Sequence, residues 1–137
     1  MTDSAGDPAE VAGLAELARF VRGEVNPAVF PHREHVRMAF ALLWQYDFAE
    51  TAFRYTTALR VMAARAGAPE AFHQTTTIAF LSLIAERMLQ VQGADFTAFE
   101  HANPDLLEKS ALARWYRPER LASAAARLTF LLPDRAP

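Results

Sequence analysis

The sequence predicts an all-α protein with a four-helix core bundle and a C-terminal wrap of short helices. Apolar residues recur at helical spacing in four long segments, and proline or glycine marks the breaks between them. Hydrophobic residues make up 52% of the 137 residues, which is enough for a core. The single strand-like segment, 128–132, is too short to form a sheet by itself. We therefore expect residues 1–137 to form a single helical domain, in which 1–7 is a flexible N-terminal tail.

The first helix is predicted from Pro8 to about Glu24. Asp7 suits the N-cap, and Pro8 suits the first helical position because its missing N–H needs no partner there. The dipeptide Asn26-Pro27 ends the segment. The apolar face of this helix is predicted to consist of Val11, Leu14, Leu17, Ala18 and Val21.

The second and third helices show the same start and stop signals. Pro31 can open the second helix, and Val36–Tyr46 continues it. Asp47 is the expected cap of the third helix, which is predicted over Phe48 to about Ala66. Gly67 suits the residue after that helix, where a positive φ angle is common.

The fourth helix, predicted from Pro69 to about Gln92, is the longest and most apolar, and Gly93 ends it. Beyond it the pattern breaks into shorter elements, so we expect a wrap rather than a fifth long helix. A short helix is predicted to start at Asp95 and to end at Asn103-Pro104. Another start is predicted at Arg117-Pro118, which leads into a helix over 121–127. Residues 128–132 are predicted to form either a strand or an extended strap, ended by Pro133.

Composition excludes several classes of protein. Sixteen acidic residues against 14 basic ones argue against nucleic-acid binding, which requires a basic excess. The absence of cysteine excludes disulfides, thiolate metal sites, iron–sulfur clusters and cysteine nucleophiles. No apolar run approaches the roughly 20 residues that cross a bilayer, and the first ten residues do not resemble a secretory signal. We expect a soluble cytoplasmic protein with no membrane partner.

Three of the four histidines begin apolar helical faces. His32 and His35 lie three residues apart, so both imidazoles share one face of the second helix. His73 begins the inward face of the fourth helix, with Thr77 one turn later. If consecutive long helices alternate in direction, the second and fourth are parallel. The three side chains are then expected at the same end of the bundle.

This convergence predicts a divalent transition metal, because neutral imidazole is a common ligand of such ions. Three protein ligands and one open position are typical of catalytic rather than structural zinc. Zinc, iron and copper are not distinguished by the sequence. The predicted metal ligands are His32, His35 and His73. Side chains expected to add a ligand or to orient the rings are Glu24, Gln74 and Thr77.

The pattern leaves alternatives open. One hypothesis is a metal-dependent enzyme acting on a small molecule; the alternative is a metal-free module with structural histidines that binds a small ligand or a partner protein. A third is an accessory protein of a larger assembly, and a homo-oligomer is also compatible with the sequence. The segment Arg114–Arg117 is interpreted either as a clamp for an anionic or planar ligand or as a latch over the core. His101 is expected to be exposed.

Three motifs also suggest a relationship to other proteins. They are Phe30-x-His32-x-x-His35, Phe72-His73-x-Thr75-x-Thr77, and a tail of Asn103-Pro104-Asp105-Leu106-Leu107, Trp115-Tyr116, Ala126-Arg127, Phe130 and Pro133-Asp134. Together they resemble an uncharacterised family of small bacterial helical proteins, over about Phe30 to Asp134. In that family the residue after the second-motif histidine is often acidic, whereas here it is Gln74. The resemblance implies that both histidine motifs and the tail belong to one unit, and it implies no activity.

Overall fold

The computed structural model describes residues 8–136, and the side chains from residue 13 onward. The described chain is helical and contains no strand, which confirms the all-α class. The predicted tail, 1–7, and the side chain of Val11 lie outside the described residues. The α-helices are α1 (Pro8–Val21), α2 (His32–Gln45), α3 (Phe48–Arg65), α4 (Gln74–Gln90), α5 (Phe96–Ala102), α6 (Pro118–Leu121) and α7 (Ala124–Leu128). Short 3-10 turns are η1 (Pro27–Val29), η2 (Pro69–Ala71), η3 (Pro104–Leu107) and η4 (Lys109–Arg114).

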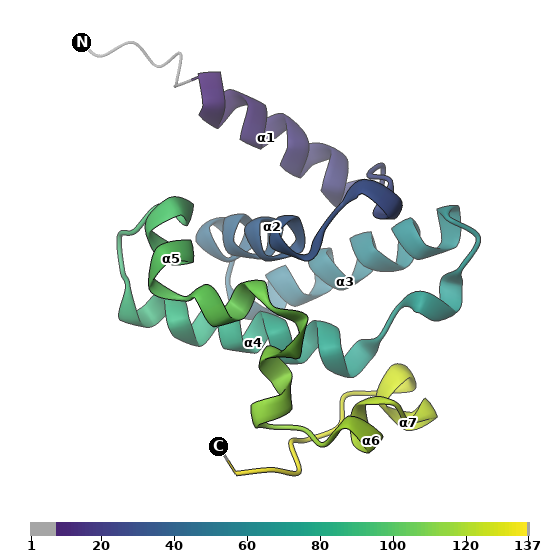
Figure 1. Ribbon diagram of the computed structural model, residues 1–137. Helices are drawn as coiled ribbons and strands as arrows, with labels where there is room; N and C mark the ends of the chain where they lie inside the picture. Colours follow the sequence, from purple (N-terminus) through teal and green to yellow (C-terminus); the bar gives the residue numbers. More distant parts are fainter. Residues whose placement is uncertain (1–7, 137) are drawn as a thin grey trace.

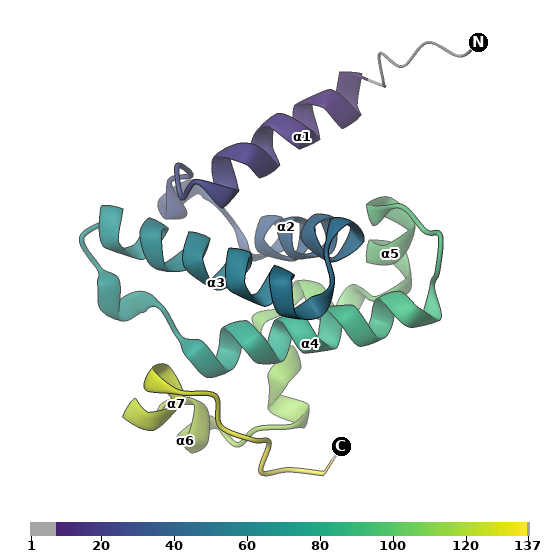
Figure 2. The same cartoon turned by 180° about the vertical axis from the view of Figure 1, so that it is seen from behind.

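Helices α2, α3 and α4 pack against one another, and α1 lies across α2 and α3 (Figure 1). Seen from behind, α3 and α4 run side by side and are joined at one end through η2 (Figure 2). The short helices α6 and α7 lie below α4, and α7 contacts it (Figure 1). Within residues 8–136, no helix combines the length and the apolar character needed to span a membrane.

The buried face of α1 differs from the predicted one. Leu17 and Phe20 are buried, and the Phe20 ring contacts Phe30 and Tyr55, with centroids 5.7 Å and 5.6 Å away. Leu14, predicted on the inward face, is 54% exposed. The reason is geometric, because the N-terminal half of α1 diverges from α2 and has no helix to cover it (Figure 1). Only the C-terminal half of α1 therefore contributes to the core.

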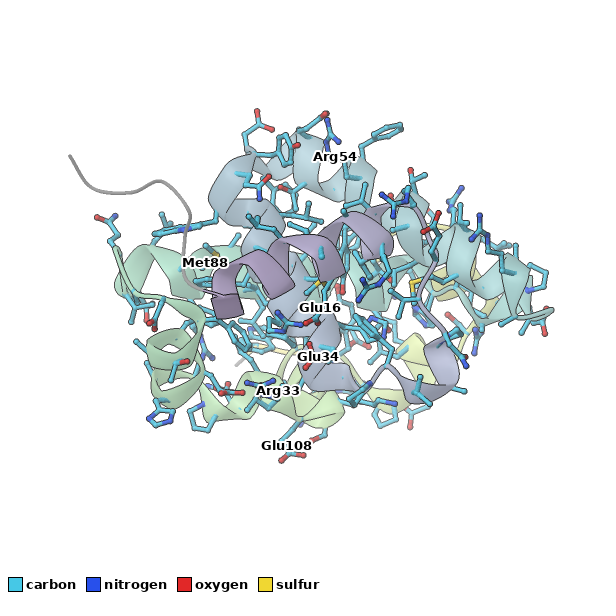
Figure 3. All side chains as sticks on the ribbon, turned by 90° about the horizontal axis from the view of Figure 1, so that it is seen from above. Glu16, Arg33, Glu34, Arg54, Met88 and Glu108 are labelled. Atoms are coloured by element: carbon cyan, nitrogen blue, oxygen red, sulfur yellow. The ribbon has the colours of Figure 1, made fainter. Side chains whose placement is uncertain are left out.

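Ion pairs join α1 and α5 to the start of α2. Arg37 bonds Glu34 one turn earlier, at 2.6 Å, and also Glu16 of α1. Figure 3 shows Glu16 and Glu34 close together on the same side of the molecule. Arg33, beside them, pairs with Glu100 of α5. These pairs are partly exposed, so each contributes little to stability, but together they position the N-terminal turn of α2.

The predicted cap at Asp47 and the predicted helix start at Asp95 are both confirmed. The carboxylate of Asp47 accepts a hydrogen bond from the Glu50 amide at 2.9 Å at the start of α3. The Asp95 carboxylate does the same for the Ala98 amide at 2.9 Å at the start of α5. Gly67 has a φ angle of +76°, as expected for the residue that reverses the chain after α3. Local chemistry therefore determines these boundaries.

The predicted start of α4 at Pro69 is wrong. Residues Pro69–Ala71 form the separate turn η2, and α4 begins at Gln74. His73 has extended backbone angles, and its ring nitrogen Nδ1 accepts a hydrogen bond from the Thr76 amide. A side-chain acceptor at the N-cap satisfies an amide that the helix itself leaves free. The histidine therefore starts the helix that the proline was expected to start.

The predicted helix over 121–127 is also divided. Residues Ala122 and Ser123 interrupt it, and the Ser123 hydroxyl accepts from the Ala126 amide at 3.2 Å to start α7. After α7 the chain is extended without pairing into a strand; we call residues 129–136 the C-terminal strap. Of the two alternatives predicted for 128–132, the extended strap is the one observed.

The strap is held by two buried side chains. The Thr75 hydroxyl donates to the Thr129 carbonyl at 2.8 Å and accepts from the Leu131 amide at 3.0 Å. The Tyr116 hydroxyl donates to the Leu131 carbonyl at 2.8 Å. Both Thr75 and Tyr116 are almost completely buried. The strap thus supplies backbone partners to polar groups that would otherwise be buried without one.

Candidate functional site

A pocket of about 780 Å³ lies where α2 and α4 begin. Its walls come from η1, the first turns of α2 and α4, and the C-terminal half of α3. Most of the lining is aliphatic or aromatic, including Phe30, Tyr55, Phe72 and Phe80. The remaining lining residues are His32, His35, His73, Thr76, Thr77 and Lys109. The structure therefore brings the three predicted histidines to one pocket.

His32 is held in place by the C-terminal half of the chain. Its Nε2 lies 3.0 Å from the Leu106 carbonyl oxygen, which can only accept, so Nε2 carries the proton. The edge of the ring meets Phe80, with centroids 4.8 Å apart. Burial lowers the pKa of His32, the Leu106 hydrogen bond opposes that shift, and the Lys109 charge adds to it. The ring is therefore neutral at neutral pH.

His35 is more deeply buried than His32. Its edge meets Phe30, with centroids 4.9 Å apart. Burial lowers the pKa of His35 to about 4, and the nearby His32 and the Lys109 charge act in the same direction. A charged imidazolium would lose its hydration in this apolar environment, so the neutral form is strongly favoured.

His73 uses both of its ring nitrogens in hydrogen bonds. Nδ1 accepts from the Thr76 amide at 3.0 Å and caps α4. Nε2 donates to the Leu121 carbonyl at 2.7 Å and ties α6 to the start of α4. A neutral imidazole has one donor and one acceptor, and both are occupied here. In this arrangement His73 has no lone pair left for a metal ion.

The other predicted site residues are dispersed. Glu24 is exposed and pairs with Arg22 at 3.0 Å, outside the pocket lining. The side-chain oxygen of Gln74 accepts from Arg60 at 3.3 Å, also outside the lining. Thr77 does line the pocket and is buried. Of the three supporting residues, the structure places only Thr77 with the histidines.

The predicted metal ligands are not arranged as a metal site. Among the described side chains, from residue 13 to residue 136, no three histidines or carboxylates are placed so that they could share an ion. In a three-histidine site, His73 would have to release the Thr76 amide that its Nδ1 accepts. His32 could offer only Nδ1 to the metal, because its Nε2 bonds the Leu106 carbonyl. As placed here, the three histidines do not form a ligand set for the predicted metal.

Some site residues have no signal in the sequence. Lys109 reaches the pocket from η4, in a region where the sequence shows only fragmented periodicity. The segment Arg114–Arg117 forms a latch, because Tyr116 is buried and the Arg117 amide donates to Asp134 of the strap at 2.8 Å. His101 is exposed, as expected.

Comparison of the chain with protein-family models, with curated proteins and with solved structures gave no match. The resemblance to small bacterial helical proteins therefore stays a prediction, and the function is inferred from the pocket.

Proposed function

We propose that this protein is a metal-free module that binds a small, mainly apolar ligand in the pocket between η1, α2, α3 and α4. The single observation that carries the proposal is a pocket of about 780 Å³ with an apolar wall and a few polar groups. This is the size and composition of small-molecule sites in general. In the proposal the four-helix core, α1 to α4, is the scaffold, and the C-terminal wrap holds the histidine wall in place.

The volume limits the size of the ligand. One water molecule occupies roughly 30 Å³ in the liquid, and a heavy atom of an organic ligand requires a similar space. A pocket of about 780 Å³ therefore has room for roughly 26 non-hydrogen atoms. A medium-length acyl chain or a compound of two or three rings meets this limit.

The polar groups of the pocket suit recognition better than proton transfer at neutral pH. His32 and His35 are both neutral, because burial lowers the pKa of each ring. The proton on His32 Nε2 is already donated to Leu106, which leaves Nδ1 as an acceptor. The Thr76 and Thr77 side chains add hydroxyl groups to the same wall. These groups would orient a ligand that the apolar wall desolvates.

The proposal is tested with a neutral dye and a pair of matched variants. Ala66 and Ala64 are both exposed alanines at the C-terminal end of α3, but only Ala66 lines the pocket. Fluorescence titration with a neutral dye such as Nile red should show saturable binding to the wild type and to Ala64→Phe. Ala66→Phe should bind at least tenfold more weakly, because its ring enters the pocket. Equal affinities for the two variants would contradict the proposal.

Elemental analysis tests the competing hypothesis, in which the three histidines bind a metal. Protein expressed in metal-replete medium should contain no stoichiometric zinc, iron or copper. Stoichiometric metal that disappears in His73→Ala would overturn the metal-free proposal in favour of the predicted three-histidine site.

A further inference from the structure

We propose that the ligand is an anionic amphiphile, with an apolar body in the pocket and a carboxylate paired with Lys109. This inference rests on the proposed function and names the chemical class of its ligand. Three observations carry it: the position of Lys109 at the pocket, its lack of an ion-pair partner among the described residues, and the neutrality of the adjacent histidines.

Lys109 is the cation of the pocket. It is the first residue of η4 and lines the pocket together with His32 and His35. Its positive charge lowers the pKa of both histidines, so the ammonium group lies on their side of the pocket. It is also the only lysine of the chain. Its side chain is exposed, so the charge stays in contact with solvent.

Nothing in the described part of the chain neutralises this charge by an ion pair. The acidic residues on the neighbouring segments already pair with arginines: Glu100 with Arg33, and Asp105 with Arg87 at 2.8 Å. Glu108 precedes Lys109 and its charge reaches His32, but it forms no ion pair with Lys109. Figure 3 shows Glu108 at the edge of the molecule. A bound anion would therefore be the first close partner of the ammonium group.

Arg60, a cation that contacts the pocket-lining Phe72, is already engaged. Its guanidinium lies over the Phe72 ring, 4.9 Å from the centroid, and donates to the Gln74 amide oxygen at 3.3 Å. His32 cannot donate to a carboxylate, because its N–H is already donated to the Leu106 carbonyl, and a neutral histidine cannot balance the carboxylate charge. Because an unpaired carboxylate is costly to remove from water, the head group is expected at Lys109 and the apolar body deeper inside.

The test compares dodecanoate with dodecanol, which share the same chain and differ in the charge of the head group. Each competes with the neutral dye for the wild type, for Lys109→Met and for Arg114→Met. Arg114 is a matched control, because it is an exposed cation on the same turn η4 but lies outside the pocket lining. Both substitutions remove one positive charge.

Dodecanoate should bind the wild type and Arg114→Met with similar affinity, and Lys109→Met roughly fivefold more weakly, as expected for one exposed ion pair. Dodecanol should bind all three proteins equally. The affinity for dodecanoate, unlike that for dodecanol, should also fall as salt is added. Equal effects of the two substitutions on dodecanoate would overturn the assignment of Lys109. Dye binding without displacement by dodecanoate would overturn the ligand class, and failure of the dye itself would instead refute the proposed function.

Discussion

His73 is the residue at which the structural and the metal-binding interpretations predict different results. Replacing it by alanine removes the acceptor that caps α4 and the donor that holds the Leu121 carbonyl. Loss of an N-cap costs about 1 kcal/mol, and loss of one net hydrogen bond costs about 1 kcal/mol more. His73→Ala should therefore lower the free energy of unfolding by roughly 2 kcal/mol. His73→Asn should cost roughly half as much, because asparagine retains the cap but cannot reach Leu121.

Thermal and urea unfolding followed by circular dichroism measure these differences. In a chain of this size each kcal/mol corresponds to a shift in Tm of roughly 4 °C, so we expect about 8 °C for alanine and about 4 °C for asparagine. The measurements should be repeated with a chelator, which should not change either difference. Equal losses for the two variants would refute the capping role. Losses that vanish with the chelator would show that His73 stabilises the protein through a metal.

Two further predictions concern His35 and Thr75. The pKa of His35 is about 4 in the folded protein and 6.5 in the unfolded chain. Between these two pH values the unfolded chain binds a proton that the folded protein does not. The free energy of unfolding therefore falls as the pH falls from 6.5 to 4. In urea unfolding, the wild type should lose roughly 2.5 kcal/mol more than His35→Leu between pH 7 and pH 4.5, and parallel pH profiles would contradict this. Thr75→Val removes two hydrogen bonds to the strap, whereas Thr75→Ser keeps them. Limited proteolysis should therefore cleave the strap much faster in the valine variant only, and equal rates would show that the hydroxyl does not hold it.

The sequence predicts the structure best where a feature depends only on residues that are close together along the chain. The Asp47 and Asp95 caps and the positive φ angle after α3 all follow from one to four residues. The convergence of the histidines required only helix spacing and alternating helix directions. The start of α4 was misplaced because a proline is a familiar start signal, whereas the His73 ring that caps α4 is also held by the Leu121 carbonyl, 48 residues away.

The candidate site was harder to predict than the fold. Whether a histidine nitrogen is free for a metal depends on carbonyl groups of residues 106 and 121, and no local pattern reveals those contacts. Lys109 reaches the pocket through a series of short turns whose path is set by packing of the whole molecule. The residue types at the site were therefore visible in the sequence, but their hydrogen-bond partners were not.

The contacts of the strap have a consequence for how the molecule opens. The hydrogen bonds that tie the first turn of α4 to the C-terminal segments join residues 48 to 56 positions apart, whereas each helix is held by local bonds. Closing these long loops costs conformational entropy, so we expect this segment to dock late in folding and to detach before the helical core. Detachment of this segment would free His73 Nε2 from the Leu121 carbonyl while the helices α1 to α4 stay folded. We therefore expect the C-terminal segments to have their own local opening equilibrium, which exposes His73 without global unfolding.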